Sequence, residues 1–157
     1  MKLDRFFFVS IVIIFFGCQS GDSPSPPMYS DPLLVELSQM TGKYLWNPEL
    51  KRFVYSEKMQ IENILSRRNP DELVVVLADC LDDKKPSRST LGDATVVMGI
   101  ICYEALSQTA YYEHILPNGD IAPEWAGHME PNANTSQLEA AKKAWQLVIN
   151  AKTYKLL

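Results

Sequence analysis

Cysteine thiols are the side chains of this sequence that best suit covalent chemistry. The 157-residue chain contains three of them, Cys18, Cys80 and Cys102. A thiol can be acylated, can pair as a disulfide in an oxidising compartment, or can stay buried as a small apolar group. The sequence around each cysteine therefore decides which chemistry we expect there.

Cys18 directly follows a segment that is typical of an export signal. A basic amino-terminal end precedes the apolar run 6–16, and a small residue follows it, which is the order found in signal peptides. The run is shorter than the roughly 20 apolar residues that a membrane-spanning helix needs. The tetrad Phe15-Phe16-Gly17-Cys18 resembles the lipobox of bacterial lipoproteins. An ordinary secretory signal with an incidental cysteine is the alternative.

The lipobox resemblance implies cleavage before Cys18 and a diacylglycerol on its sulfur, so that acyl chains such as palmitate hold the protein on the membrane. It places the protein in the bacterial cell envelope, facing the periplasm. Gln19 follows Cys18 where an inner-membrane retention signal has Asp, which implies the outer membrane rather than the inner one. The expected organisation is a signal peptide at 1–17, a lipidated cysteine with a flexible linker rich in Ser and Pro at 18–32, and one α-helical domain at 33–157.

Cys80 and Cys102 form a candidate disulfide, which the oxidising periplasm would favour. Both lie in apolar stretches that favour helices. In a simple antiparallel helical hairpin Cys102 would lie about three turns from the connection, an offset on the order of 15 Å that no disulfide spans. A second helix that begins late or breaks at Gly99 would bring the two thiols together. Two buried free thiols are the alternative.

Aromatic residues concentrate between the last apolar stretch and the long connection that follows it. This candidate interaction surface consists of Tyr103, Tyr111, Tyr112, His114 and Trp125. Tyrosine and tryptophan combine an apolar body with a polar group, as protein interfaces often require. The same residues could instead line a seam between a helix and the connection 114–134, with Trp125 fixing the connection in place.

No pattern of catalytic, metal-binding or cofactor-binding residues stands out. The two histidines, His114 and His128, lack the ligand spacing of a zinc site. The serines lack the context of a nucleophile elbow, and there is no Gly-rich phosphate loop. The net charge of −4 gives no basic face for a nucleic acid. We therefore expect no catalytic residues, no metal, no cofactor and no nucleic-acid partner.

Helix signals dominate the remainder of the sequence. Asp31 followed by Pro32, and Asn69 followed by Pro70, each combine a capping side chain with proline at the first helical position. Apolar residues recur at three- and four-residue spacings in the other segments. The expected helices cover 33–40, 49–68, 70–81, 90–112 and a final segment that starts at Ser136. A strand through 96–102 is a competing interpretation of the most apolar stretch.

These elements predict a mainly α fold, a small helical bundle or a short helical-repeat stack. The helix, charged loop and helix around 82–89 are weakly similar in architecture to HEAT-type repeats, although no fixed period recurs. A helical domain on a lipid tether, without enzyme motifs, is typical of a binding or accessory module.

The expected function is therefore a lipid-anchored cell-envelope protein that binds another envelope macromolecule, with a protein as the expected partner. One alternative is an immunity-type protein that neutralises a periplasmic toxin through an acidic surface. An envelope hydrolase, which would require carboxylates that converge in a cleft, is the other.

Overall fold

The computed structural model describes residues 29–115, 118–119 and 125–157. The expected signal peptide, Cys18 and most of the expected linker lie outside the described residues. The described part contains both helices and strands, and two sheets are formed. The fold is therefore mixed α and β, and the expectation of a mainly α bundle or helical-repeat stack is wrong.

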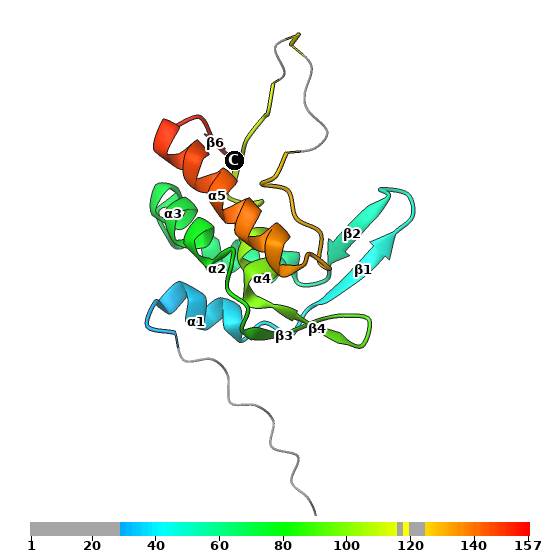
Figure 1. The fold of residues 1–157 in the computed structure, drawn as a ribbon. Coiled ribbons are helices and arrows are strands. Elements are labelled where there is room, and N and C mark those ends of the chain that lie inside the picture. The colour runs from blue at the N-terminus through cyan, green and yellow to red at the C-terminus, as the bar shows by residue number, and fades with distance from the viewer. Residues whose placement is uncertain (1–28, 116–117, 120–124) are drawn as a thin grey trace, which may run out of the picture.

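Helices and strands follow one another in mixed order along the described chain (Figure 1). The helices are α1 (Pro32–Ser38), α2 (Lys58–Leu65), α3 (Pro70–Cys80), α4 (Met98–Leu106) and α5 (Thr135–Ala151). The strands are β1 (Lys43–Asn47), β2 (Arg52–Tyr55), β3 (Pro86–Leu91), β4 (Ala94–Val97), β5 (Ala110–Tyr111) and β6 (Lys155–Leu156).

The larger sheet has the strand order β2-β1-β3-β4. Two antiparallel hairpins, β1–β2 and β3–β4, are joined by a parallel pairing between β1 and β3, in which Lys43 lies opposite Thr90. β2 is thus an edge strand, and Figure 1 shows the β1–β2 hairpin reaching away from the helices. The short strands β5 and β6 form a separate antiparallel pair.

Helix α4 lies at the centre of the packing. It contacts α1, α2 and α3 as well as β3 and β4, and seven of its nine residues are buried. A helix that is apolar almost all round must be covered on nearly every side. The strands of the larger sheet and the other helices provide this cover, and α5 packs on α3 beside them.

Two of the expected helix starts are confirmed. The Asp31 side chain accepts a hydrogen bond from the Leu33 amide and caps α1, with Pro32 as the first helical residue. Asn69 caps α3 in the same way by accepting from the Asp71 amide. These caps satisfy amides that a helix leaves without partners at its start, so their position is encoded locally.

The expected helix at 49–68 is wrong in its first half, where β2 takes its place. The Asn47 side chain accepts hydrogen bonds from the Glu49 and Leu50 amides, at 3.0 and 2.9 Å, and Lys51 has a φ of 49°. These features turn the chain back on itself, and β2 then pairs along β1. Only the second half of the segment forms a helix, α2.

The expected helix at 90–112 begins late. Residues 86–97 form the β3–β4 hairpin instead, with Gly92 at a φ of 59° in its turn. The β-branched residues before Met98 suit strands better than helices. The final helix also differs in its start, because a capping box forms between Asn134 and Gln137 rather than at Ser136.

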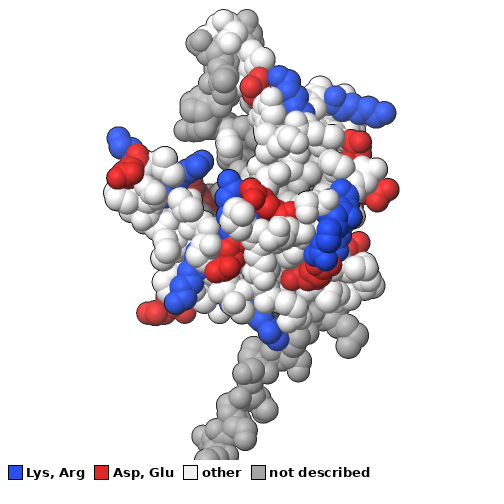
Figure 2. Space-filling model, turned by 180° about the vertical axis from the view of Figure 1, so that it is seen from behind, with Lys and Arg blue, Asp and Glu red and all other residues white. Residues whose placement is uncertain are grey.

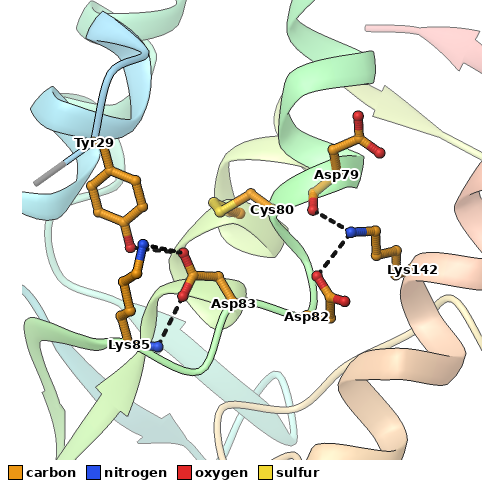
Figure 3. The surroundings of a disulfide bond; sticks show 8 residues. Tyr29, Asp79, Cys80, Asp82, Asp83, Lys85 and Lys142 are labelled. Atoms are coloured by element: carbon orange, nitrogen blue, oxygen red, sulfur yellow. Dashed lines mark hydrogen bonds and ion pairs between the residues drawn. A yellow bond between two sulfur atoms is a disulfide. The ribbon is translucent and has the colours of Figure 1, made fainter. Parts of the chain in front are cut away.

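The late start of α4 explains how the disulfide forms. Cys80 ends α3, and Cys102 lies only about one turn into α4. Their Cα atoms are 5.9 Å apart, and the structure joins them through their sulfurs (Figure 3). Gly99 permits this close approach, because a Cβ atom there would lie 2.2 Å from the Leu81 carbonyl oxygen.

Candidate functional site

One polar stripe of helix α4 is not covered by the surrounding helices and strands. Tyr103 and Glu104 are the only residues of this helix that are not buried. Ser107 and Gln108 continue the stripe just beyond its end, three and four positions after Glu104, which places them on the same side of the helix. On an otherwise buried helix, this stripe marks where other molecules can reach the centre of the protein.

The stripe forms one wall of a cleft of about 410 Å³, which we call the hairpin cleft. Its volume lies within the roughly 300–1,000 Å³ of small-molecule sites. The lining residues come from the β1–β2 hairpin, from the start of α2, from α4 with the residues that follow it, and from the segment 128–131. They are Tyr44, Arg52, Phe53, Val54, Tyr55, Lys58, Ile100, Tyr103, Glu104, Ser107, Gln108, His128, Met129, Glu130 and Pro131.

Tyr44 lines this cleft and is a buried tyrosine. The residue is only 4% exposed, and its hydroxyl makes no hydrogen bond within the described part of the chain. Burial, and next the charge of Glu104, raise the pKa of Tyr44 far above its usual range, so the hydroxyl keeps its proton. A buried polar group without a partner is rare, because leaving it unpaired costs about 1–3 kcal/mol.

Glu104 and Gln108 offer acceptor oxygens to the same cleft. The Gln108 side-chain amide donates a hydrogen bond of 3.3 Å to the Glu104 carboxyl, while the Gln108 side-chain oxygen is buried and has no partner among the described residues. Burial raises the pKa of Glu104, and the Gln108 hydrogen bond together with the charges of Lys58 and Arg52 opposes this rise. This wall therefore suits a ligand group that donates hydrogen bonds.

The side of the cleft formed by β2 and α2 is basic. Arg52 on β2 and Lys58 on α2 both line the cleft and lie near enough to Glu104 to affect its titration. Among the described residues, neither cation forms an ion pair with a carboxylate. An acidic group and two basic groups thus border one cleft without neutralising each other in direct pairs.

Of the residues expected at an interaction surface, only Tyr103 lines the hairpin cleft. Its hydroxyl lies 2.9 Å from the Nδ1 atom of His128, which ties α4 to the segment 128–131. Tyr111 lies on β5 with 37% of its surface exposed, and the Lys155 ammonium lies over its ring at 5.6 Å. The five residues therefore do not form one continuous exposed patch.

Tyr112, His114 and Trp125 instead gather in an aromatic cluster against the core. The Trp125 ring lies 4.8 Å from Tyr112 and 5.1 Å from Trp145, and the His114 ring lies 6.2 Å from Tyr112. Trp145 is buried, and its indole donates to the Gly127 carbonyl. This packing favours the interpretation that Tyr112 and Trp125 line a seam between the core and the long connection.

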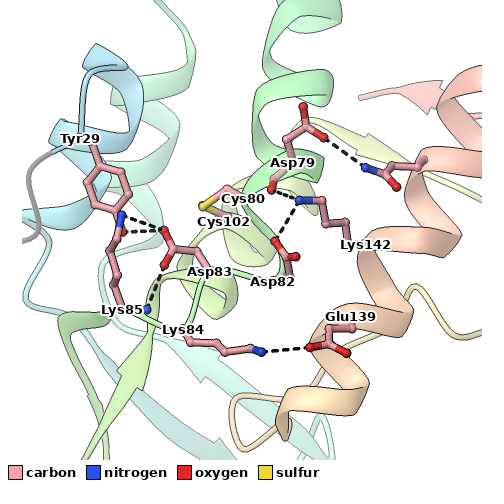
Figure 4. A network of polar contacts seen from close by, with 11 residues as sticks. Tyr29, Asp79, Cys80, Asp82, Asp83, Lys84, Lys85, Cys102, Glu139 and Lys142 are labelled. Atoms are coloured by element: carbon pink, nitrogen blue, oxygen red, sulfur yellow. Dashed lines mark hydrogen bonds and ion pairs between the residues drawn. A yellow bond between two sulfur atoms is a disulfide. The ribbon is translucent and has the colours of Figure 1, made fainter.

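The polar groups around the disulfide form a second cluster, whose charges are already paired (Figures 3 and 4). Lys142 on α5 donates to the Asp79 carbonyl and to the Asp82 carboxylate, at 2.8 and 2.9 Å. The Asp83 carboxylate accepts from the Tyr29 hydroxyl and lies 3.9 Å from Lys85. These contacts join α3, α5 and the start of β3, so we assign them a structural role.

Charges of both signs are also interspersed across the face shown in Figure 2. Ion pairs there and elsewhere account for several of them, including Arg67 and Arg68 with Glu36, and Lys84 with Glu139. Exposed pairs of this kind contribute at most about 1 kcal/mol each. The hairpin cleft differs because its charged residues Arg52, Lys58 and Glu104 form no ion pair among the described residues.

The Glu104→Gln variant tests the electrostatics of the cleft. Because the pKa of Glu104 is raised on folding, the folded protein binds more protons than the unfolded chain from the ordinary glutamate range upward. The stability that the protonated Glu104 carboxyl contributes is therefore lost as the pH rises from the ordinary glutamate range through the raised pKa of Glu104. We expect Glu104→Gln to gain stability relative to wild type at neutral pH but not at acidic pH, in denaturant titrations across pH.

Glu49→Gln, in the exposed hairpin turn, is the matched control for removing one negative charge. A stability difference between wild type and Glu104→Gln that stays constant with pH, or that shrinks toward neutrality, would contradict the burial of this carboxyl.

Most residues of the hairpin cleft were not singled out by the sequence. The polar positions 104, 107 and 108 on one side of an apolar helix are the one local signal that could have indicated it. In the described part of the chain, no three His, Cys, Asp or Glu side chains are grouped to hold a metal ion, and no helix there is long and apolar enough to cross a membrane. Comparison with protein-family models, curated proteins and solved structures gives no match.

Proposed function

We propose that this chain is a lipid-anchored cell-envelope protein that binds another envelope macromolecule through the hairpin cleft. The observation that carries the proposal is the polar stripe of α4, where a central helix presents Glu104 and Gln108 to a cleft with an unpartnered Tyr44 hydroxyl. Groups of this kind are costly to bury unless a ligand satisfies them. A binding role accounts for that cost.

The exposed surface of the β1–β2 hairpin supports a large partner there. Leu45, Trp46 and Leu50 expose 59%, 56% and 54% of their surfaces beside the cleft. The Trp46 ring packs edge-on against Phe53, with centroids 5.2 Å apart. Exposed apolar residues concentrated on one projecting hairpin are typical of interaction surfaces.

The anchor is tested by the Cys18→Ser variant. We expect it to lose labelling by a fatty-acid analogue completely and to move from the membrane fraction to the soluble fraction, because no thiol remains to be acylated. Cys80 and Cys102 provide the internal control, since neither should carry label in the wild type. Label that persists in Cys18→Ser would contradict the anchor.

The binding surface is tested by photo-crosslinking in the native membrane. A photoreactive residue at Trp46 should capture a defined envelope component, whereas one at Leu147 should not. Leu147 is the matched control because it is an apolar residue of α5 that is 71% exposed and does not line the cleft. Equal capture from the two positions would contradict a partner that contacts the hairpin.

An envelope hydrolase is a second candidate, favoured by one observation. Glu104 and Glu130 both line the cleft, and glycoside hydrolysis uses one carboxyl with a raised pKa and a second carboxylate. Incubating the protein with cell-wall glycan should then release reducing ends, and Glu104→Gln and Glu130→Gln should each abolish the release. Absence of any release by wild type would reject this candidate.

The immunity-type alternative finds less support. It requires an acidic surface, yet Arg52 and Lys58 line the cleft. The carboxylates of Asp82 and Asp83 are engaged by Lys142, Lys85 and Tyr29. The described surface around the cleft thus fits a ligand of mixed charge better than a strongly basic toxin.

A further inference from the structure

The hairpin cleft runs along the free edge of a strand. Successive side chains of a strand point to opposite faces of the sheet. Four successive residues of β2, from Arg52 to Tyr55, nevertheless line the same cleft. The cleft therefore follows the edge of β2 rather than one of its faces, and this edge has no partner strand among the described residues.

The register of the hairpin shows which backbone groups face that edge. The Ser56 amide donates to the Lys43 carbonyl at 2.9 Å, so this pair is of the hydrogen-bonded type. Hydrogen-bonded and non-hydrogen-bonded pairs alternate along an antiparallel ladder. Phe53 and Tyr55 therefore direct their backbone N–H and C=O groups away from β1. An unpaired strand edge of this kind is a template for another extended backbone.

The charged groups of the cleft add a second requirement, because a ligand paired with the edge of β2 must also match their charges. Glu104 and the Gln108 side-chain oxygen suit a group with several N–H donors, and an ammonium group meets this requirement. Arg52 and Lys58 suit a carboxylate. A free amino acid would offer both charges but no run of backbone amides, whereas a peptide offers all three features.

We propose that the hairpin cleft binds a short extended peptide as an added strand on β2, with its ammonium group at Glu104 and Gln108 and its carboxylate at Arg52 and Lys58. The inference rests on the proposed binding function and names what the cleft itself takes, a short free peptide, whereas the exposed residues of the β1–β2 hairpin contact the macromolecule. The Tyr44 hydroxyl, buried at the same cleft, supplies one further hydrogen-bond donor for the bound chain.

Titration of the full-length protein in detergent micelles with tri-alanine tests this proposal. Calorimetry gives the affinity, and ¹⁵N NMR reports on the Gln108 side-chain amide. N-acetyl-tri-alanine and tri-alanine amide each lack one terminal charge. We expect each to bind at least about tenfold more weakly, because a charge-assisted hydrogen bond contributes about 1.5–3 kcal/mol.

Substitutions of Glu104 and Arg52 test which side of the cleft binds each terminus of the peptide. In Glu104→Gln the penalty for acetylating the amino terminus should disappear, while the penalty for amidating the carboxyl terminus remains. Arg52→Ala should show the reverse pattern. Lys143→Ala, which removes an exposed lysine of α5 outside the cleft, should leave both penalties unchanged.

The inference is overturned if tri-alanine does not bind, if the blocked peptides bind as tightly as the free one, or if both variants retain both penalties. The crosslink from Trp46 judges the proposed function separately. If the crosslink from Trp46 forms but tri-alanine does not bind, the peptide proposal is rejected and the binding function is kept. If neither the crosslink nor peptide binding is observed, both proposals are rejected.

Discussion

Replacing both Cys80 and Cys102 with alanine should lower the free energy of unfolding by about 3 kcal/mol, the largest effect that we expect from any substitution. The disulfide closes a loop with a sequence separation of 22, and the loss of loop-closure entropy in the unfolded chain gives about that value. For a domain of this size the corresponding fall in Tm is on the order of 10 °C. Guanidinium titration of the variant and of the oxidised wild type measures the difference.

Reduced wild type is the control for the volume that alanine removes. Both cysteines are buried, with Cys102 fully inaccessible, so an alanine variant also loses packing. Wild type unfolded and reduced before titration keeps both thiols and should reproduce most of the destabilisation. Identical stability of the oxidised and reduced proteins would show that the cross-link contributes nothing, and two reactive thiols in the unreduced, unfolded chain would show that it is absent.

Removing the hydroxyl group from two neighbouring tyrosines should change stability in opposite directions, with the two variants separated by about 3 kcal/mol. The rings of Tyr44 and Tyr55 lie 4.8 Å apart, and both residues are buried. Tyr44→Phe removes an unpartnered hydroxyl and should raise the free energy of unfolding by about 1 kcal/mol. The same variant should bind the cleft ligand more weakly.

Tyr55→Phe should instead lower the free energy of unfolding by about 2 kcal/mol. The Gly42 amide donates to the Tyr55 hydroxyl at 3.2 Å, and this hydroxyl lies 2.7 Å from the Ser89 Oγ. Because Ser89 donates its own proton to the Met40 carbonyl, Tyr55 is the donor to Ser89. Removing the hydroxyl leaves the buried Gly42 amide unpaired and takes one of its hydrogen bonds from the buried Ser89 hydroxyl.

Paired urea titrations of the two variants measure these effects against wild type. Each substitution removes one oxygen from a buried tyrosine in the same part of the core, so differences in volume and in ring packing largely cancel between them. Equal destabilisation by both substitutions would show that Tyr44 has a partner that satisfies its hydroxyl. A gain in stability that accompanies a loss of binding is the expected mark of a functional residue.

Local signals in the sequence predict the elements that carry their own start. Asp31 and Asn69 each bond an amide two residues ahead, so the information that begins α1 and α3 lies within a few residues of chain. The β1–β2 hairpin also has a local signal, since Asn47 bonds the Glu49 and Leu50 amides. Leu50, Phe53 and Val54 recur at helical spacing, however, and this pattern favoured a helix at 49–68 over the hairpin.

The cleft could not be predicted in this way, because its walls meet only through tertiary pairing. Tyr44 and Arg52 reach α4 because β1 joins the sheet beside β3, a contact between residues 43–44 and 90–91. The hydrophobic periodicity of a single segment does not show which other strand it will pair with. The same holds for the disulfide, which depends on where α4 starts and on the close approach at Gly99.

The parallel pairing of β1 with β3 also sets an order of assembly. The loop closed by Cys80 and Cys102 contains the β3–β4 hairpin, so this part of the fold forms from residues that are near in sequence. Joining β1 to β3 closes a much longer loop, which costs more entropy and is slower. We therefore expect the oxidised core to form first and the β2 edge to reach its place last, so that the chain acquires its candidate binding site only after the disulfide has formed.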